Sequence, residues 1–547
     1  EMCRRDISSP SPPSPLIIIF LMVQLGSILS YPISIVLLVG LMIRVIIAIY
    51  LPAGYDEAYY FIYTQNLDWS YFDHPVFVAL TTGLGVWLTG EVNQFTIRIG
   101  TLIITTGSLY CLYLTGKKLF NHQSGLLTLI IASMIPIFTV AFGVLTLPDV
   151  PLMFFLTLTI LFACDEFFSD EDQLTYKPSY RLVLIGLWLG LACLSKYHGF
   201  VFGLSLVGFC LFNPPYRKVF ASPWLIATFG VFIITLFPLL YWNWQHDWVS
   251  FGFQLSTRFD SPNPTPLTIN LLNILVVALV SIAYLFPSFG FPLWWVGGVT
   301  LDSELRGKSN LRYQLILWIS LPLIIGFTLL GGVTQILPTW AMPGFWFLTL
   351  ILGDFSARWS KYHPKLIQRW LFFSFLIINT LIVIALSHFS LGLFQKPNQN
   401  AFFTGLIPPE NDPSTELIDI VQLRSNLESS PEFTTALQQA DFIFTNQYYL
   451  GGYIGMAIEP LTNIPLTCFS SDNRGFDYWY PQAKLKGKRG LYITTERFTE
   501  KEIEEKYRQH FEQWREVTQI PLVRSGAITE VFYIYEGINL ISVPFKQ

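Results

Sequence analysis

Long apolar stretches recur through most of this sequence, and they constrain its fold more than any other feature. A helix needs about 20 apolar residues to cross the hydrocarbon core of a membrane, because each residue adds only about 1.5 Å. Hydrophobic residues make up 52% of the chain and charged residues 13%, and the mean hydropathy is +0.48. This composition excludes an ordinary soluble protein, so we expect a polytopic α-helical membrane protein.

The lengths of the apolar stretches predict about eleven transmembrane spans. They cover roughly residues 32–52, 94–116, 124–143, 150–166, 181–195, 199–213, 223–242, 270–298, 313–331, 337–353 and 367–389. Two prolines flank Asp149 in LPDVP, so this segment is predicted to be the tip of a helical hairpin. Residues 1–31 are predicted to be a membrane-associated lead-in, because no clear small-residue cleavage site follows the first apolar stretch.

Lys and Arg are distributed unequally between the connecting segments. In the predicted membrane region, the alternate loops hold only Lys196 and Arg258. The other segments carry Arg4, Arg5, Lys117, Lys118, Lys177, Arg181, Arg217, Lys218, Arg306, Lys308, Arg312, Arg358, Lys361, Lys365 and Arg369. Because basic loops stay on the cytoplasmic side, we expect a multi-pass protein of the cell's inner (plasma) membrane, whose alternate loops and C-terminal region are extracytoplasmic.

The composition changes near Phe394, where long apolar stretches end. Strand-like runs (DFIFT, GLYIT, EVFYIYE) and a helix-like charge pattern (EKEIEEKYRQHFEQW) predict a small α/β domain over 394–547. The predicted organisation is therefore a lead-in, a membrane domain over 32–393 and this soluble extracytoplasmic domain. Six scattered cysteines show neither metal-ligand spacing nor a disulfide framework.

Acidic residues among the apolar spans are candidates for function, because a charge at a helix centre costs roughly 2.5–3.5 kcal/mol. Asp56 and Glu57 directly follow the first span. Partial desolvation there would raise the pKa of a carboxyl group and suit it to general-base catalysis. The alternatives are structural: an interfacial acid that ends a helix, and a turn or N-cap role for Asp149.

The segment over 53–93 is aromatic, carries further acids and His74, and is at first too polar to span a membrane. It is predicted to form amphipathic helices that lie in the outer interface and roof a site. Lys196 and Arg258 are the cations available to an anionic ligand on that side, although long basic side chains also snorkel to headgroups. These groups fit one scheme, in which the cations hold a lipid phosphate while a carboxylate activates an acceptor hydroxyl.

The motifs DEAYYFIYTQNLDWSYFDHPVFVAL, LTLPDVPLMFF, LACLSKYHGFVFGL, NWQHDWVSFGFQ and ILPTWAMPGFW occur in this order. In this arrangement the chain resembles the bacterial protein-mannosyltransferase-type and aminoarabinose-transferase-type glycosyltransferases, multi-span enzymes of the GT-C fold class. The stretches FTNQYYLGGYIGMAIEP, NRGFDYWYP and KGKRGLYITTE resemble the periplasmic domain of bacterial members. The resemblance covers nearly the whole chain after about residue 32.

The resemblance implies transfer of a sugar from a polyprenyl-phosphate donor to a lipid, glycan or protein acceptor, with inversion and without a nucleotide or nucleic acid. It assigns the catalytic base to Asp56, with Glu57 beside it, and gives Asp149 the orientation of donor or acceptor. It places the donor phosphate on Lys196 and, by a looser match, Arg258. The remaining residues at motif positions, expected to bind substrate by orientation or packing, are Tyr59, His74, Tyr197 and Trp340.

Two other function classes stay open at this level. A lipid-linked sugar transporter or flippase would carry ionisable residues within spans, and Arg44 and Arg98 are such residues, although pairing with an acid or packing explains them too. A polysaccharide polymerase or ligase would share the lipid-linked donor. No cofactor is predicted; a divalent metal is left open, but no ligand spacing supports one.

Overall fold

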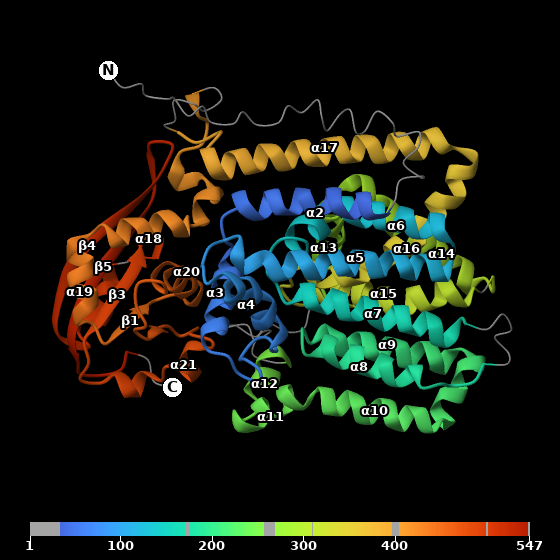
Figure 1. The fold of residues 1–547 in the computed structure, drawn as a ribbon, viewed down its shortest axis with the longest axis horizontal. Helices are drawn as coiled ribbons and strands as arrows, with labels where there is room; N and C mark the ends of the chain where they lie inside the picture. Colours follow the sequence, from blue (N-terminus) through green and yellow to red (C-terminus); the bar gives the residue numbers. More distant parts are fainter. Residues whose placement is uncertain are drawn as a thin grey trace, which may run out of the picture.

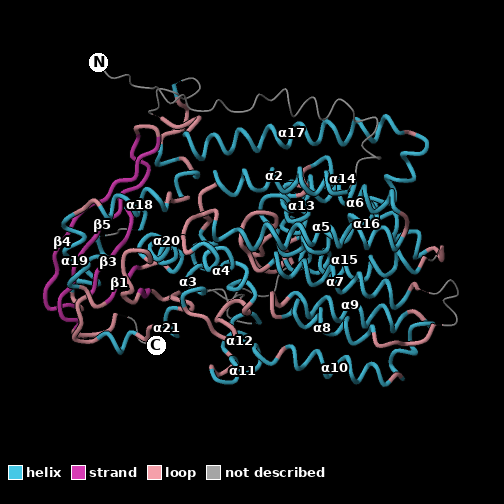
Figure 2. Tube along the Cα trace, viewed as in Figure 1, coloured by secondary structure: helices cyan, strands magenta, loops and turns pink. Residues whose placement is uncertain are grey.

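The structure is a computed structural model that describes residues 33–169, 176–255, 269–308, 310–396, 404–498 and 501–544. Figure 1 shows a bundle of helices that run side by side along the long axis and a smaller domain at one end of it. In the described chain the strands lie in this smaller domain, here called the tail domain (Figure 2). The predicted combination of a helical region and a C-terminal α/β domain is confirmed.

Most of the predicted spans coincide with helices of the bundle. These are α2 (Ile33–Tyr50), α5 (Ile99–Leu119), α6 (His122–Met134), α7 (Asp149–Phe167), α8 (Arg181–Cys193), α9 (His198–Phe212), α10 (Pro223–Thr235), α15 (Leu311–Leu330), α16 (Met342–Tyr362) and α17 (Pro364–Leu391). Within the described residues, five helices are long and apolar enough to cross a membrane, or up to seven if each of two bent pairs is one span. The number of spans therefore stays a prediction.

Proline determines where several of these helices end. The stretch 270–298, predicted as one span, forms α13 (Leu271–Tyr284) and α14 (Pro287–Leu305) instead. A residue before proline avoids the helical conformation, and Phe286 adopts a φ of 66° before Pro287. The span predicted over 270–298 thus corresponds to two helices that meet at Pro287.

The predicted interruption before Asp149 is present. Helix α6 ends at Met134, because Ile135 precedes a proline and is extended. A turn of π-helix, η3 (Ile137–Ala141), follows, and α7 begins at Asp149. An acid at a helix N-terminus is favourable because it faces the positive end of the helix dipole, so Asp149 also stabilises the start of α7.

A bend of 49° separates α10 from α11 (Phe237–Gln245). Pro238 lies in the first turn of α11, where it lacks the N–H that would continue the hydrogen bonding of α10. The short helix α12 (Val249–Leu255) follows. The chain therefore turns away from the bundle axis between α10 and α12, beside the segment that joins α2 to α5 (Figure 1).

Two helices, α3 (Tyr55–Gln65) and α4 (Phe77–Thr89), lie between α2 and α5 in the chain. The sequence predicted amphipathic helices here, but every residue of α3 from 57 to 64 is buried. Figure 1 shows α3 between the bundle and the tail domain. The structure differs from the prediction because the tail domain covers the side of α3 that was expected to be exposed.

The tail domain contains a five-stranded sheet in the order β2-β1-β3-β5-β4. Its strands are β1 (Phe442–Thr445), β2 (Leu466–Cys468), β3 (Gly490–Thr495), β4 (Phe511–Arg524) and β5 (Ala527–Leu540), and its helices include α18 (Ile420–Glu428), α19 (Pro431–Gln439), α20 (Tyr448–Ile458), α21 (Phe476–Trp479) and α22 (Lys501–Arg508). Strand β1 pairs in parallel with β2 and β3, whereas β5 pairs antiparallel with β3 and β4.

The charge pattern near residue 501 predicted one helix through Trp514, and this is wrong after Arg508. Strand β4 begins at Phe511, and Trp514 pairs with Gly537 of β5. The hairpin between them turns at Ser525 and Gly526, which both have positive φ, as a two-residue type I′ turn requires. The antiparallel partner, which lies later in the chain, therefore overrides the local helical pattern.

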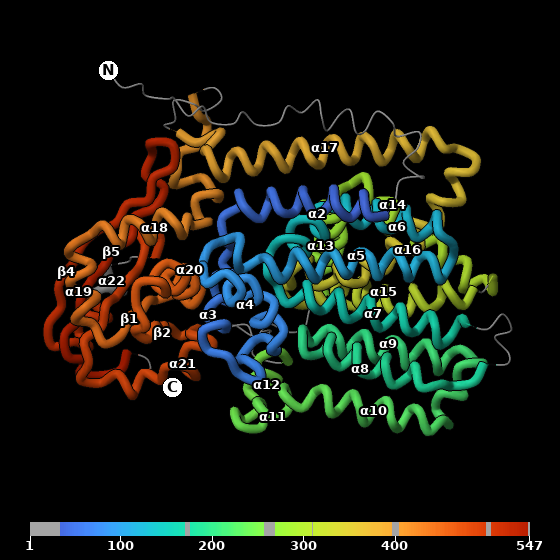
Figure 3. The backbone as a smooth tube through the Cα atoms, in the orientation of Figure 1, coloured from blue at the N-terminus to red at the C-terminus, as the bar shows by residue number. Residues whose placement is uncertain are grey.

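Helix α20 attaches the tail domain to α3, and the tube in Figure 3 shows the two helices side by side. A Cβ on Gly452 would lie 2.3 Å from the backbone carbon of Ala58, so only glycine permits this approach. The Tyr453 hydroxyl donates to the carbonyl oxygen of Ala53 at 2.7 Å. Side chains of α3, α20 and the sheet form one continuous hydrophobic core, so α3 packs as part of both domains.

Candidate active site between the bundle and the tail domain

The motifs that the sequence singles out come together at the end of the bundle where α3, α4 and the tail domain meet. The backbone N–H of Thr146 donates to Glu57 Oε1 at 2.9 Å, which joins DEAYY to the segment before LPDVP. The backbone N–H of Phe77 donates to the carbonyl oxygen of Leu194 at 3.3 Å, which joins FDHPVF to SKYHG. Motifs that are far apart in the sequence therefore form one candidate site.

Glu57 is fully committed to a buried ion pair. Arg98 donates to its two carboxylate oxygens at 2.8 and 2.6 Å, and the two side chains are 0% and 1% exposed. The backbone N–H groups of Gly54 and Thr146 donate to the same carboxylate. The other N–H groups of Arg98 donate to three backbone carbonyls at the end of α2. This arrangement fixes α3 on α2 and gives Glu57 a structural place beside the site.

Asp56 has the opposite environment, because it is exposed in the first turn of α3. Tyr60 lies one helical turn later on the same face, and its ring packs edge-on against the ring of His74, with centroids 5.6 Å apart. Burial raises the pKa of the Tyr60 hydroxyl well above its ordinary value, and the charge of Asp56 raises it further. Asp56 and His74 therefore both neighbour Tyr60.

Asp149 and Lys196 form the second buried ion pair of the site. Lys196 lies in the turn between α8 and α9, and its Nζ donates to both carboxylate oxygens of Asp149, at 2.8 and 2.7 Å. The Lys196 and Asp149 side chains are only 9% and 6% exposed. Lys196 therefore does not extend its side chain to a membrane surface. Its ammonium group has three N–H bonds, of which two donate to Asp149, so one N–H remains as a donor.

Asp73 and Arg474 form an ion pair between the two domains that sequence reasoning did not single out. Arg474 Nη1 donates to Asp73 Oδ2 at 3.0 Å, and the Asp73 side chain is 2% exposed. The hydroxyl of Tyr63 donates to the other carboxylate oxygen. Burial alone would lower the pKa of Arg474, but the charge of Asp73 raises it above the ordinary value. The signal in the sequence was that both residues lie in motif stretches, FDHP and NRGFDYWYP.

The other predicted site residues that the structure describes pack against neighbouring side chains or contact the tail domain. The Tyr59 hydroxyl accepts a hydrogen bond from the backbone N–H of Gly475 at 3.0 Å, so Tyr59 serves the contact with the tail domain. Tyr197 follows Lys196 and packs edge-on against Phe251. Trp340 is buried and packs against aromatic neighbours. Arg258 lies outside the described residues.

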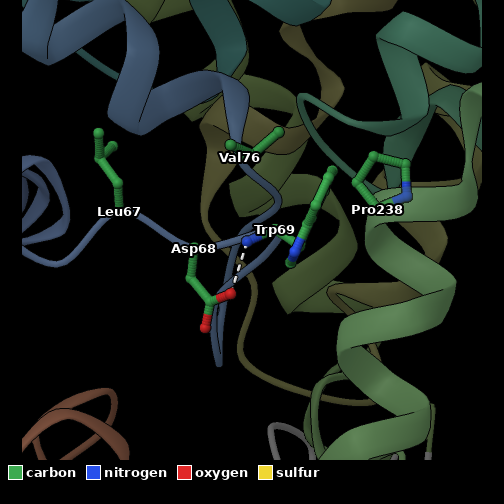
Figure 4. Close-up of a pocket in the computed structure, with 5 residues that line it drawn as sticks. All are labelled: Leu67, Asp68, Trp69, Val76 and Pro238. Carbon is green, nitrogen blue, oxygen red and sulfur yellow. Dashed lines mark hydrogen bonds between the residues drawn. The ribbon is translucent and has the colours of Figure 1, made fainter.

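The described residues contain no group of three or more His, Cys, Asp or Glu side chains that could hold a metal ion. A hollow of about 360 Å³ lies at the edge of the site, where Leu67, Asp68, Trp69 and Val76 face Pro238 of α11 (Figure 4). The indole N–H of Trp242 donates to Asp68 at 2.8 Å and joins the same two segments. None of the predicted site residues lines this hollow.

Comparisons with known proteins show what this chain is similar to. The family model described as dolichyl-phosphate-mannose-protein mannosyltransferase matches residues 73–242, which include FDHP after its first residue, LPDVP and SKYHG. A lipid A galacturonosyltransferase, RgtD, of Rhizobium johnstonii is 26% identical over 312 residues, which cover 56% of this chain and 60% of that protein. The alignment thus spans less than two thirds of this curated relative.

Solved structures share the fold over nearly the whole chain. The crystal structure of ArnT from Cupriavidus metallidurans bound to undecaprenyl phosphate has a TM-score of 0.60 at 12% identity and covers 94% of this chain and 99% of that one. Its apo structure has a TM-score of 0.58 at 13% identity. The chain therefore shares the fold of ArnT, and its sequence is similar to the mannosyltransferase family and to a lipid A galacturonosyltransferase. The three ion pairs and Asp56 therefore lie at the end of the helical bundle where the tail domain meets it.

Proposed function

We propose that this protein is a membrane glycosyltransferase of the GT-C class that moves a sugar from a polyprenyl-phosphate donor to an acceptor at the extracytoplasmic face of the inner membrane, with Asp56 as the general base. The observation that carries the proposal is the environment of Asp56. It is exposed, whereas Glu57, Asp73 and Asp149 at the same junction are buried. An acceptor hydroxyl therefore has access to Asp56.

The reaction breaks the bond between the anomeric carbon of the sugar and the phosphate oxygen, and it forms a bond from that carbon to the acceptor oxygen. Asp56 takes the proton of the acceptor hydroxyl, and the bonding electrons leave with the polyprenyl phosphate. Attack from the side opposite the phosphate inverts the anomeric configuration. A well-placed base contributes about 10²–10⁴-fold to such a step.

Lys196 is the proposed partner of the departing phosphate. Two of its three N–H groups hold Asp149, and the third is available for a phosphate oxygen. Asp149 fixes the direction of the ammonium group and stabilises its charge in a buried position. The charge that develops on the phosphate is then met by a cation that is already oriented, and such preorganisation is the main source of electrostatic catalysis.

An apolar cavity supports a lipid-linked donor. It has a volume of about 390 Å³, lies between α8, α9 and α10, and is lined almost entirely by apolar side chains. Gly199 and Phe200 line it at the start of α9, and the N–H of Gly199 donates to the carbonyl oxygen of Lys196 at 3.0 Å. A polyprenyl chain in this cavity would bring its phosphate toward Lys196. That an ArnT structure contains undecaprenyl phosphate also supports this donor class.

The test compares wild type with Asp56→Asn and a matched control. Protein purified in detergent is incubated with radiolabelled polyprenyl-phosphate sugars and a membrane lipid extract. The control is Glu91→Gln, which removes the charge of another exposed acid of the same segment. We expect one donor to turn over, Asp56→Asn to lower that rate by about 10²–10⁴-fold, and Glu91→Gln to leave it unchanged.

Other outcomes would count against the proposal. Equal turnover in wild type and Asp56→Asn would show that Asp56 is not the base and would direct attention to Asp149. An equal loss of turnover in Asp56→Asn and Glu91→Gln would mean that the effect follows from removing a negative charge from this segment and not from the position of Asp56. If wild type transfers or hydrolyses no donor, the glycosyltransferase proposal fails, and transport of a lipid-linked sugar becomes the next activity to test.

A further inference from the structure

The ion pair between Asp73 and Arg474 joins residues 401 positions apart in the sequence. Arg474 contacts several other groups at the same time. Its guanidinium lies 4.3 Å from the centroid of the Tyr448 ring and 5.3 Å from that of Phe253 in α12, and its Nε donates to Asp472 at 3.1 Å. Arg474 thus connects the tail domain to both the FDHP loop and α12.

Asp73 is held from several sides. Its carboxylate accepts from Arg474 and from the hydroxyl of Tyr63, and its backbone carbonyl accepts from the Gln254 side chain at 2.6 Å. Its side chain is 2% exposed. A buried carboxylate is costly without a cation, so the position of the FDHP loop depends on Arg474 of the other domain.

This loop leads directly to the proposed reaction centre. His74 follows Asp73 and packs against Tyr60, one helical turn from Asp56 on the same face of α3. Phe77, at the end of the loop, is hydrogen-bonded to the segment that carries Lys196. A displacement of Asp73 would therefore change the spacing between α3, which carries the proposed base, and the proposed phosphate site.

We propose that Arg474 is a positioning residue for sugar transfer, through which the tail domain holds the FDHP loop and sets the distance between Asp56 and Lys196. Arg474 itself is not a phosphate ligand in this scheme, because Asp73 and Asp472 already neutralise its charge. The tail domain is thereby part of the catalytic assembly rather than a separate cover. The kinetic part of this inference rests on the proposed function.

The experiment uses the full chain in lipid nanodiscs and compares Arg474→Gln with Arg489→Gln. Arg489 is a matched control, because it pairs with a buried acid, Glu536, inside the tail domain, and its side chain is 29% exposed against 21% for Arg474. Two readouts are taken: backbone amide hydrogen exchange over residues 70–77, and steady-state kinetics with the polyprenyl-phosphate sugar that the wild-type protein turns over in the test of the proposed function.

For Arg474→Gln we expect about tenfold faster exchange over 70–77. We also expect kcat to fall by about 10²-fold, since a 1 Å misplacement can cost that much, while the KM for the donor changes little. Arg474→Lys, which keeps the cation, should restore protection and most of the turnover. Arg489→Gln should change neither readout over this segment.

The inference is overturned if exchange over 70–77 is the same in Arg474→Gln and wild type. It is also overturned if an active Arg474→Gln keeps its kcat, or if the loss appears in the donor KM, which would make Arg474 a binding residue. A wild-type protein that turns over no donor would refute the proposed function alone, because the exchange measurement still decides whether Arg474 holds the loop.

Discussion

The Glu57–Arg98 and Asp149–Lys196 ion pairs are both buried, and each contains an acid that the sequence singles out. They differ in whether the basic side chain has an N–H group that is not used within the pair or by the backbone. Both oxygens of Glu57 accept hydrogen bonds from Arg98 and from the backbone of Gly54 or Thr146, and the other N–H groups of Arg98 donate to backbone carbonyls at the end of α2. Lys196 makes two contacts, both to Asp149, and keeps a third N–H. A saturated pair stabilises structure, whereas an unsaturated one is able to bind an anion.

The largest effect should follow from Arg98→Gln. This change leaves Glu57 charged and buried, and breaking such a pair from one side costs about 3–5 kcal/mol of stability. We expect a large drop in the apparent Tm of the purified protein and loss of activity in proportion to unfolding. An Arg98→Gln protein with wild-type Tm would contradict the structural role of this pair.

Lys196→Gln should affect activity more than stability, whereas Arg98→Gln should affect stability first. The amide still donates to Asp149, which also faces the positive end of the α7 dipole. The Tm should therefore fall less than in Arg98→Gln, although a buried carboxylate loses its cation. Loss of the cation should lower kcat/KM for the donor by about 10²–10³-fold. Lys196→Arg, which keeps the charge, is the control and should retain more activity. If Lys196→Gln lowers the Tm as much as Arg98→Gln does, both pairs have the same structural role, and the proposed difference between them is wrong.

Asp149→Asn should have a smaller effect. Lys196 keeps a hydrogen-bond acceptor but loses its opposite charge, so we expect kcat to fall roughly tenfold, which corresponds to about 1.4 kcal/mol in the activation barrier. Because the competing anion is gone, the KM for the donor should fall or stay constant. A rise in the donor KM would indicate instead that Asp149 binds the donor directly.

The smallest effect should come from an exposed pair. Near the end of α14, Arg306 Nε lies 2.8 Å from Asp302 Oδ2, but the Asp302 and Arg306 side chains are 58% and 71% exposed. Exposed pairs contribute between about 0 and 1 kcal/mol, so Asp302→Asn should leave both Tm and turnover near wild type. A strong effect would mean that burial is not what distinguishes the ion pairs of this protein.

Much of the site could be predicted from the sequence because its motifs are local. Asp56, Asp149 and Lys196 stand where apolar stretches end, and the structure places them at one end of the bundle. Their roles could not be separated in this way. Asp56 and Glu57 are neighbours with the same chemistry, and only the fold exposes one of them and buries the other against Arg98.

The sequence by itself determined the membrane class, the order of the helices and the presence of an α/β tail domain, because these depend on the length and periodicity of local apolar patterns. The tertiary structure decided the rest. In the fold, α20 packs against α3, the end of a predicted helix belongs to strand β4, and Asp73 pairs with Arg474. These outcomes depend on partners hundreds of residues away or across a sheet, and no local pattern contains them.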